Sequence, residues 1–170
     1  MKNRHSIHLE GYDYSLPAAY FVTMVSHKRV NLFGDIISGR VLLSKYGLLV
    51  EKICLWLPQH YPYVQLEPYV VMPNHVHAIL QIMESEDSRG GSRPAPTYIK
   101  PLGQIIGAFK TVSAKSINQI RNTPGNHVWQ RGFYERIIRN EKQLSDIWNY
   151  IEANPNSWLE DRINLKISNT

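Results

Sequence analysis

Two strand-like segments flank a proline–asparagine turn, and this hairpin is the feature that most constrains the fold. "YVQLEPYVVM" (Tyr63–Met72) is rich in β-branched and aromatic residues, and Pro68 within it indicates an edge strand or a bulge. The pair Pro73-Asn74 is a turn signal, and "HVHAILQIM" follows it as a partner strand. Histidines therefore stand at the start of the second strand of a predicted antiparallel hairpin.

Strands and helices alternate along the rest of the chain. The sequence predicts a strand over 18–27, a helix over 44–60 with Ser44 as N-cap, a helix over 102–121, a short strand over 132–139 and a helix over 140–154 that Pro155 ends. Segment 31–43 is harder to assign, with Gly34 and Gly39 as turn signals. The pattern favours an α+β fold with an antiparallel sheet.

A polar stretch interrupts this alternation. "ESEDSRGGSRPAPTY" (84–98) is rich in Gly, Ser and Pro, and neither flanking part is complete without the other. The chain of 170 residues suits one hydrophobic core. We therefore expect a single domain over residues 1–170 with a mobile loop at 84–98.

Several classes of protein are disfavoured by composition. The sequence has no apolar run of the ~18 to 20 residues that a membrane span needs. Its first residues, "MKNRHSIHLEGYDYSL", lack the apolar core of a signal peptide. The single Cys54 excludes an internal disulfide and a zinc site built from cysteines. A cytoplasmic protein without a membrane partner is the expectation.

The positive charge is concentrated in one part of the chain. The net charge is +5, and between Lys100 and Arg139 the basic residues far outnumber the one acid, Glu135. Aromatic residues lie among them, a combination that suits single-stranded nucleic acid because charge binds phosphate and rings stack on bases. A solvated basic helix beside core aromatics would give the same composition. The candidate DNA-binding residues are Lys110, Lys115, Arg121, Arg131, Arg136 and Arg139.

The histidine pair in "NHVH" suits a metal. Side chains two apart on a strand point to the same face, so His75 and His77 would lie side by side, roughly 6 to 7 Å apart at the backbone. Two imidazoles at this spacing can hold one divalent metal ion. Two histidines on a polar strand face would look the same, so the metal interpretation needs a third ligand.

The last predicted helix offers a third ligand and a nucleophile. Tyr150 and Asn154 are four residues apart in "YIEANP" and would share a helix face. A tyrosine hydroxyl and an amide oxygen could then face one metal together. Packing of Tyr150 and a helix-terminal role for Asn154 are the alternatives.

Four motifs together resemble the small tyrosine transposases of the HUH class, which include insertion-sequence transposases and REP-associated relatives. The motifs are "MPNHVHAIL", "FK" at Phe109-Lys110, "WQRGFYERIIRNEKQL" and "YIEANP", and they span roughly residues 20–158. The resemblance implies a ferredoxin-like fold, a central antiparallel sheet with helices packed mainly on one face. It also implies a metal-dependent single-stranded DNA endonuclease and strand transferase that acts on DNA hairpins, as a monomer or a homodimer.

The resemblance also assigns the residues of a site. His75 and His77 correspond to the metal-binding histidines, Tyr150 to the nucleophile and Asn154 to the amide that completes the metal site. Mg²⁺ or Mn²⁺ fits such phosphate chemistry, because the metal would neutralise charge on the scissile phosphate. Attack by Tyr150 would give a 5′-phosphotyrosine and a free 3′-hydroxyl, and the reverse reaction would join strands.

Some alternatives stay open. Tyr134 is a rival nucleophile. Glu135 is a candidate for a residue that contacts the metal ligands without binding the metal itself. A zinc hydrolase that uses His75, His77 and His127 is a different kind of enzyme on the same residues. A domesticated relative that binds hairpins without moving DNA is the alternative without catalysis.

Overall fold

The computed structural model describes residues 13–84 and 99–158. The predicted mobile loop at 84–98 therefore lies almost wholly outside the described residues. None of the helices in these ranges has the length and apolar character that crossing a membrane requires.

Four strands form one antiparallel sheet in the order β4-β5-β1-β6. These strands are β1 (Ala18–Val25), β4 (Val64–Val71), β5 (His75–Ile82) and β6 (Tyr134–Ile138). Helix α1 (Lys45–His60) connects β1 to β4 through a small hairpin, β2 (Gly34–Ile37) and β3 (Arg40–Leu43), and α2 (Leu102–Ile120) connects β5 to β6. Without that hairpin the order is strand–helix–strand–strand–helix–strand, which is the ferredoxin-like arrangement. The α+β prediction is confirmed.

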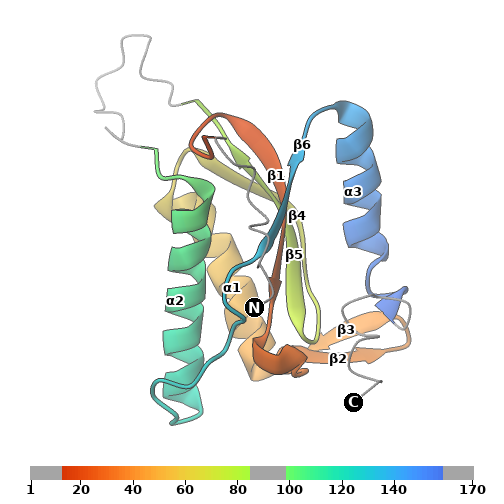
Figure 1. Cartoon of the computed structure of the whole chain (residues 1–170). Helices are drawn as coiled ribbons and strands as arrows, with labels where there is room; N and C mark the ends of the chain where they lie inside the picture. The colour runs from red at the N-terminus through yellow and green to blue at the C-terminus, as the bar shows by residue number, and fades with distance from the viewer. Residues whose placement is uncertain (1–12, 85–98, 159–170) are drawn as a thin grey trace, which may run out of the picture.

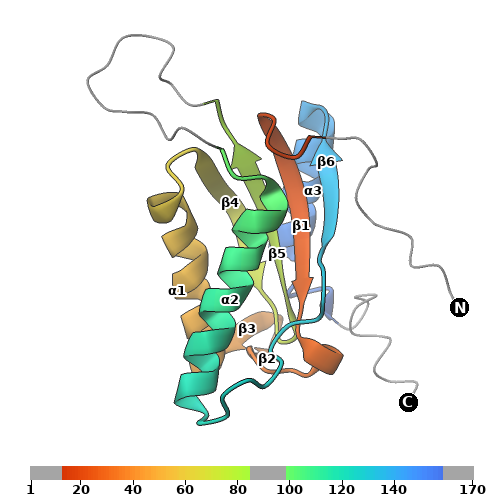
Figure 2. The same cartoon turned by 60° about the vertical axis from the view of Figure 1, so that its left-hand side comes forward.

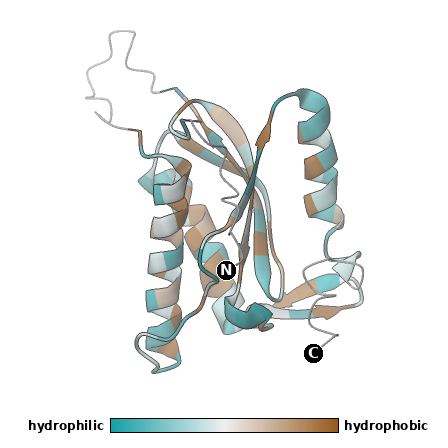
Figure 3. Cartoon of the chain, viewed as in Figure 1, coloured by the Kyte–Doolittle hydropathy of each residue, from teal (hydrophilic) through white to brown (hydrophobic). Residues whose placement is uncertain are grey.

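The main core lies between the sheet and the helices α1 and α2, which cover one face (Figure 2). Strand alternation directs Val76, Ala78 and Leu80 of β5 into this core, together with Val22 of β1. Apolar residues follow the central strands, whereas α3 (Glu141–Ala153) is mostly polar (Figure 3).

Helix α3 lies alone on the opposite face of the sheet (Figure 1). Its buried contacts form a small second cluster of Ile147, Ile151 and Ile79 of β5. The expectation that the helices pack mainly on one face holds for α1 and α2, and α3 is the exception. The sheet therefore has one face covered by a large apolar core and one face on which α3 packs through a small apolar cluster.

Local sequence signals place the ends of these elements. The Ser44 side chain accepts hydrogen bonds from the backbone N–H groups of Tyr46 and Gly47, which confirms it as the N-cap of α1. Asn140 caps α3 by accepting from the N–H of Gln143 at 2.9 Å. The predicted irregularity at Pro68 is confirmed, because β4 is an edge strand and its register with β5 shifts between Leu66 and Tyr69.

Candidate active site

The two histidines of β5 lie side by side on the sheet face that α3 covers. The ring centroids of His75 and His77 are 4.4 Å apart. Their side chains are 0% and 2% exposed, so neither lies on a solvated strand face. Burying two imidazoles is costly unless their polar atoms have partners, and hydrogen bonds reach both Nδ1 atoms and Nε2 of His77.

Asn74 fixes the orientation of His75. Nδ1 of His75 is 2.8 Å from Oδ1 of Asn74, and Nδ2 of Asn74 donates to the backbone carbonyl of Arg29 at 3.3 Å. Since an amide oxygen only accepts, His75 carries its proton on Nδ1. The lone pair is then on Nε2, on the side of the ring away from Asn74.

Thr23 and Tyr150 contact the two nitrogens of His77. Thr23, which is opposite His77 in the β1–β5 register, places Oγ1 2.8 Å from Nδ1. The Tyr150 hydroxyl is 3.3 Å from Nε2. When Thr23 accepts from Nδ1–H, Nε2 carries the lone pair and accepts the phenolic hydrogen. Both histidines then present Nε2 to the space under α3.

Helix α3 supplies Tyr150 and Asn154 from consecutive turns. The ring of Tyr150 is 45% exposed although its hydroxyl reaches a buried histidine, whereas Asn154 is 2% exposed. Oδ1 of Asn154 is buried without a hydrogen bond of normal geometry, and the side chain lies close enough to His75 to favour the protonated imidazole. The structure thus brings together the four residues that the sequence singles out.

Both histidines are neutral at ordinary pH. Burial lowers the pKa of His75 to about 3, with a further lowering from the positive charge of Arg29, and the Asn154 contact acts in the opposite direction. Burial, and then the neighbouring His75, lowers the pKa of His77 well below its usual range. A neutral imidazole is the form that binds a metal.

The donor set fits a divalent cation with open coordination positions. Two imidazole nitrogens and one amide oxygen leave positions for phosphate oxygens, and the buried Asn154 Oδ1 is an oxygen that a cation would satisfy. Among residues 13–84 and 99–158, no three His, Cys, Asp or Glu side chains gather as a metal cluster. The three-histidine zinc site is therefore not formed, and the ring of His127 instead lies 5.1 Å from that of His27.

Tyr134 and Glu135 leave strand β6 on opposite faces. Tyr134 is opposite Thr23, on the same face as the histidines, and is 47% exposed. Glu135 is opposite Val22, a residue of the main core, so alternation directs it to the other face. The structure does not bring Glu135 to the histidine pair, and it leaves Tyr134 as a matched comparison for Tyr150.

The six basic residues do not form one patch beside the histidines. Lys110 donates to the backbone carbonyls of Gln130 and Gly132, and burial lowers its pKa to about 8. Arg121 donates from Nε to Asn118 at 2.8 Å. These two, with Lys115, belong to the α2 side of the sheet, whereas Arg131, Arg136 and Arg139 are exposed along the β6 edge.

Thr23 and Asn74 are the functional candidates that sequence reasoning missed. Thr23 is the one polar residue in "AAYFVTMV", and Asn74 directly precedes the first histidine. A polar residue inside an apolar strand is a signal, but its partner depends on strand pairing that the sequence does not reveal.

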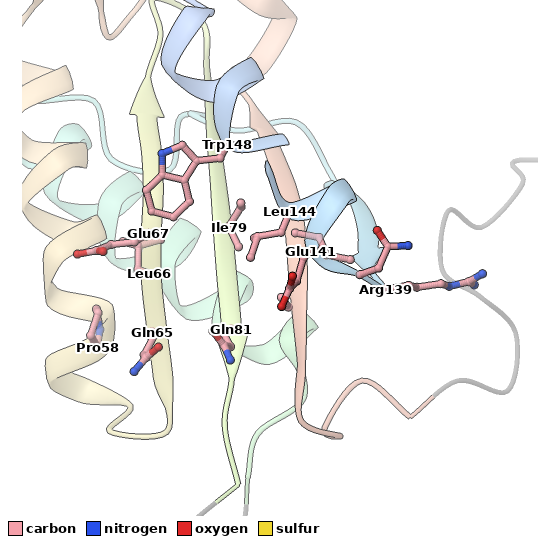
Figure 4. A pocket seen from close by; sticks show the side chains of 13 residues that line it. Pro58, Gln65, Leu66, Glu67, Ile79, Gln81, Arg139, Glu141, Leu144 and Trp148 are labelled. Atoms are coloured by element: carbon pink, nitrogen blue, oxygen red, sulfur yellow. The ribbon is translucent and has the colours of Figure 1, made fainter. Parts of the chain in front are cut away.

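The same sheet face continues as a groove of about 670 Å³ at the other end of α3. Figure 4 shows Ile79 and Gln81 of β5 on its floor, Gln65 of β4 beside them and Trp148 of α3 above. Ile79 and Gln81 continue the row of His75 and His77 along β5. The groove contains none of His75, His77, Tyr150 and Asn154, and Arg139 is the candidate DNA-binding residue that lines it.

Sequence comparison finds two related proteins of Haemophilus influenzae, and no protein-family model matches the chain. The first, described as an uncharacterized protein, is 33% identical over 172 residues, which covers 95% of this chain and 93% of that protein. The second, described as a putative REP-associated tyrosine transposase, is 24% identical over 147 residues, covering 84% of this chain and 73% of that protein.

A solved structure shares the fold. It is that of a REP-associated tyrosine transposase bound to a REP hairpin, and it aligns with a TM-score of 0.60 at 17% identity over 89% of this chain and 73% of that chain. At this identity the likeness concerns the fold. Taken together, the chain is similar in sequence to a putative REP-associated tyrosine transposase and shares the fold of a solved REP-associated tyrosine transposase.

Proposed function

We propose that this protein is a metal-dependent single-stranded DNA endonuclease and strand transferase that acts at DNA hairpins through Tyr150. The observation that carries the proposal is the position of the Tyr150 hydroxyl, 3.3 Å from Nε2 of a buried histidine pair. A tyrosine that only packs has no need to place its hydroxyl there. The related REP-associated transposase supports the same class of reaction.

His75, His77 and Asn154 are the residues that would hold the metal. Bound there, Mg²⁺ or Mn²⁺ would supply positive charge that polarises the scissile phosphate. The chain itself keeps both imidazoles neutral by burial and fixes their ring orientation through Asn74 and Thr23. These residues therefore present lone pairs without any change of protonation.

The role of Tyr150 is covalent. Its phenolic oxygen forms a bond to phosphorus while the bond from phosphorus to the 3′ oxygen breaks. The phenolic proton is lost, the leaving 3′ oxygen gains one, and the products are a 5′-phosphotyrosine and a 3′-hydroxyl. Attack by a 3′-hydroxyl on the phosphotyrosine reverses these changes and joins strands.

Hairpin DNA is the proposed partner because the structurally similar transposase is bound to a REP hairpin. The exposed arginines along β6 lie on the strand next to β1, which carries Thr23. Positive charge there would hold the backbone of a strand that passes Tyr150.

The test is capture of the covalent adduct. Hairpin oligonucleotides with single-stranded flanks, made from palindromes near the gene and labelled at the 3′ end, would be incubated with protein and Mn²⁺ and run on denaturing gels. The native protein should retain the label, and Tyr150→Phe should not, although it binds the hairpin normally. Tyr134→Phe is the matched control, since the two rings are 47% and 45% exposed on the same face.

The outcomes separate the alternatives. An adduct with Tyr150→Phe and none with Tyr134→Phe would transfer the role to Tyr134. Hairpin binding without an adduct in the native protein would favour a binding module. Cleavage without an adduct would indicate a hydrolase that uses water.

A further inference from the structure

A second hollow, of about 380 Å³, opens next to Tyr150 between β1, β6 and α3. It is separate from the groove at the far end of α3, and no residue lines both. The side chains that matter to the argument are Phe21, Thr23, Tyr134, Arg136, Asp146 and Tyr150; Glu135 also lines the hollow, but strand alternation directs its side chain to the other face of the sheet. We call this space the base hollow, because the residues that line it suit a nucleobase.

Aromatic rings surround the base hollow. Tyr134 and Tyr150 are large side chains about half exposed, at 47% and 45%, on either side of it. The ring of Phe21 also lines it and lies 6.0 Å from that of Tyr150 and 5.2 Å from that of His77. Exposed rings around an open apolar hollow suit a flat heteroaromatic ligand, because each ring offers a face or an edge for stacking.

The position of the base hollow next to Tyr150 indicates which kind of ligand would occupy it. A phosphodiester at the Tyr150 hydroxyl carries nucleosides covalently bound on both sides, so a base lies within one nucleotide of that residue. Bases in a single strand are unstacked and free to leave the strand axis. The base hollow is an apolar space that Tyr150 itself lines.

One polar edge of the hollow is acidic. Asp146 is four residues before Tyr150 and shares its face of α3, and its side chain is exposed at the hollow. A carboxylate only accepts hydrogen bonds, so it favours a base with an exocyclic amino group; thymine has none, and its ring N3–H is the one base donor it offers. Arg136, opposite Phe21 in the register, adds positive charge for a neighbouring phosphate.

We propose that the base hollow binds one unstacked nucleobase next to the scissile phosphate, and that Asp146 selects a base with an exocyclic amino group over thymine. The inference rests on the proposed function and extends it to recognition of the cleavage site. Tyr134 is then a stacking residue.

The test compares oligo-dC with oligo-dT, each of about twelve nucleotides and fluorescently labelled, by fluorescence anisotropy at one fixed salt concentration. The native protein should bind oligo-dC about tenfold more tightly, as one hydrogen bond to a charged group allows. Asp146→Ala should abolish that ratio. Glu152→Ala is the matched control, since it removes the same charge from an exposed position on the same helix and should keep the ratio.

Tyr134 tests occupancy separately. Tyr134→Ala should weaken binding of both oligonucleotides about tenfold, whereas Tyr134→Phe, which keeps the ring, should bind like the native protein. If Tyr134→Ala also melts at a lower temperature, abasic substitutions on either side of the mapped cleavage site, tested with the native protein, should show the same loss at one position.

Equal binding of oligo-dC and oligo-dT by the native protein would overturn the selection, and so would a ratio that survives Asp146→Ala. Unchanged binding by Tyr134→Ala together with no effect of any abasic site would overturn occupancy of the hollow. In those cases the hairpin adduct with native protein shows that the proposed function stands. Absence of the adduct with every substrate would instead mean that the proposed function fails.

Discussion

At the scale of single residues, the partners behind the histidines decide what the histidines can do. Asn74 and Thr23 each contact an Nδ1 atom at 2.8 Å, so both rings are held with Nε2 facing α3. Asn74 and Thr23 contact the ring nitrogens that face away from the proposed metal site. Their effect is to orient the ring and select which nitrogen carries the proton.

Thr23→Val tests this effect, because it removes the hydroxyl and almost preserves side-chain volume. We expect Mn²⁺ affinity to fall about 10- to 100-fold. The buried Nδ1 of His77 would lose its partner, at a cost of about 1–3 kcal/mol in folding stability. Isothermal titration with Mn²⁺ and thermal melting of the same preparations measure the two effects, and Thr23→Ser should restore both. An unchanged Mn²⁺ affinity in a folded Thr23→Val protein would remove Thr23 from the site.

The buried histidines also predict how folding stability depends on pH. Their folded-state pKa values are lowered, to about 3 for His75, so the unfolded chain binds protons that the folded chain does not. The free energy of unfolding should therefore be highest above the ordinary histidine pKa of about 6.5. It should fall as the pH drops below that value, by up to about 1.4 kcal/mol per pH unit for each histidine.

Urea unfolding between about pH 7 and pH 5, with a chelator present, measures this slope. The lower limit avoids most carboxylate titration. His77→Gln should reduce the slope by about half, whereas His60→Gln, at an exposed position on α1, is the control that should leave it unchanged. A native protein whose stability does not change over this range would contradict the burial of neutral imidazoles.

At the scale of elements, α3 holds Tyr150 and Asn154 over the sheet through a small apolar contact. Ile147 and Ile151 of α3 pack on Ile79 of β5, whereas α1 and α2 share a much larger core. Tyr150 and Asn154 flank Ile151 in the sequence, so the position of both depends on that contact. A change there should misplace the site before it unfolds the sheet.

Ile151→Ala is the direct test, because Ile151 is 1% exposed. We expect a loss of about 2–5 kcal/mol for the packing of the helix, with faster hydrogen exchange confined to α3. Adduct formation should fall more than hairpin binding does. Ile120→Ala on α2, at a side chain that is 48% exposed, should change none of these. Exchange that speeds up equally throughout the sheet would show that α3 is part of one cooperative core.

The elements also show what sequence reasoning can reach. Alternation in "HVHAIL" predicted the two faces of β5, and Ser44 and Pro68 marked a helix start and a strand irregularity that the structure contains. The hairpin β2–β3 was not assigned, because its strands have four residues each and its turn depends on positive φ at Ser38 and Gly39. Short strands give too few alternating positions to be distinguished from a loop.

The candidate site, too, could be predicted from the sequence only in part. Local spacing predicted that His75 shares a face with His77 and that Tyr150 shares one with Asn154. The contacts of Thr23 with His77, and of Tyr134 with the base hollow, arise from pairing of β1 with β5 and β6, between residues more than fifty positions apart or on separate elements. No periodicity in the sequence carries that information.

At the scale of the whole molecule, the sheet separates the main apolar core from the candidate active site. One face holds the core, and the other holds the histidines, α3 and the base hollow. The basic residues are divided between the two sides, and on the α2 side Lys110 and Arg121 are engaged in hydrogen bonds within the protein. DNA that reaches Tyr150 should therefore follow the arginines along the β6 edge.

Two triple variants that each remove three positive charges test this path. The first variant replaces the β6-side arginines with glutamine, namely Arg131, Arg136 and Arg139. The second replaces three exposed lysines of α1 and α2 with glutamine, namely Lys45, Lys52 and Lys115. Because released counterions set the salt dependence of binding, loss of three phosphate contacts should make the negative slope of log K against log salt shallower by about 2. We expect this change, with at least about tenfold weaker hairpin binding, for the arginine variant. The lysine variant should differ little from the native protein, since non-specific attraction alone depends on net charge and would weaken both variants alike. Equal losses in the two variants would place the DNA by overall charge, and the path along β6 would be wrong.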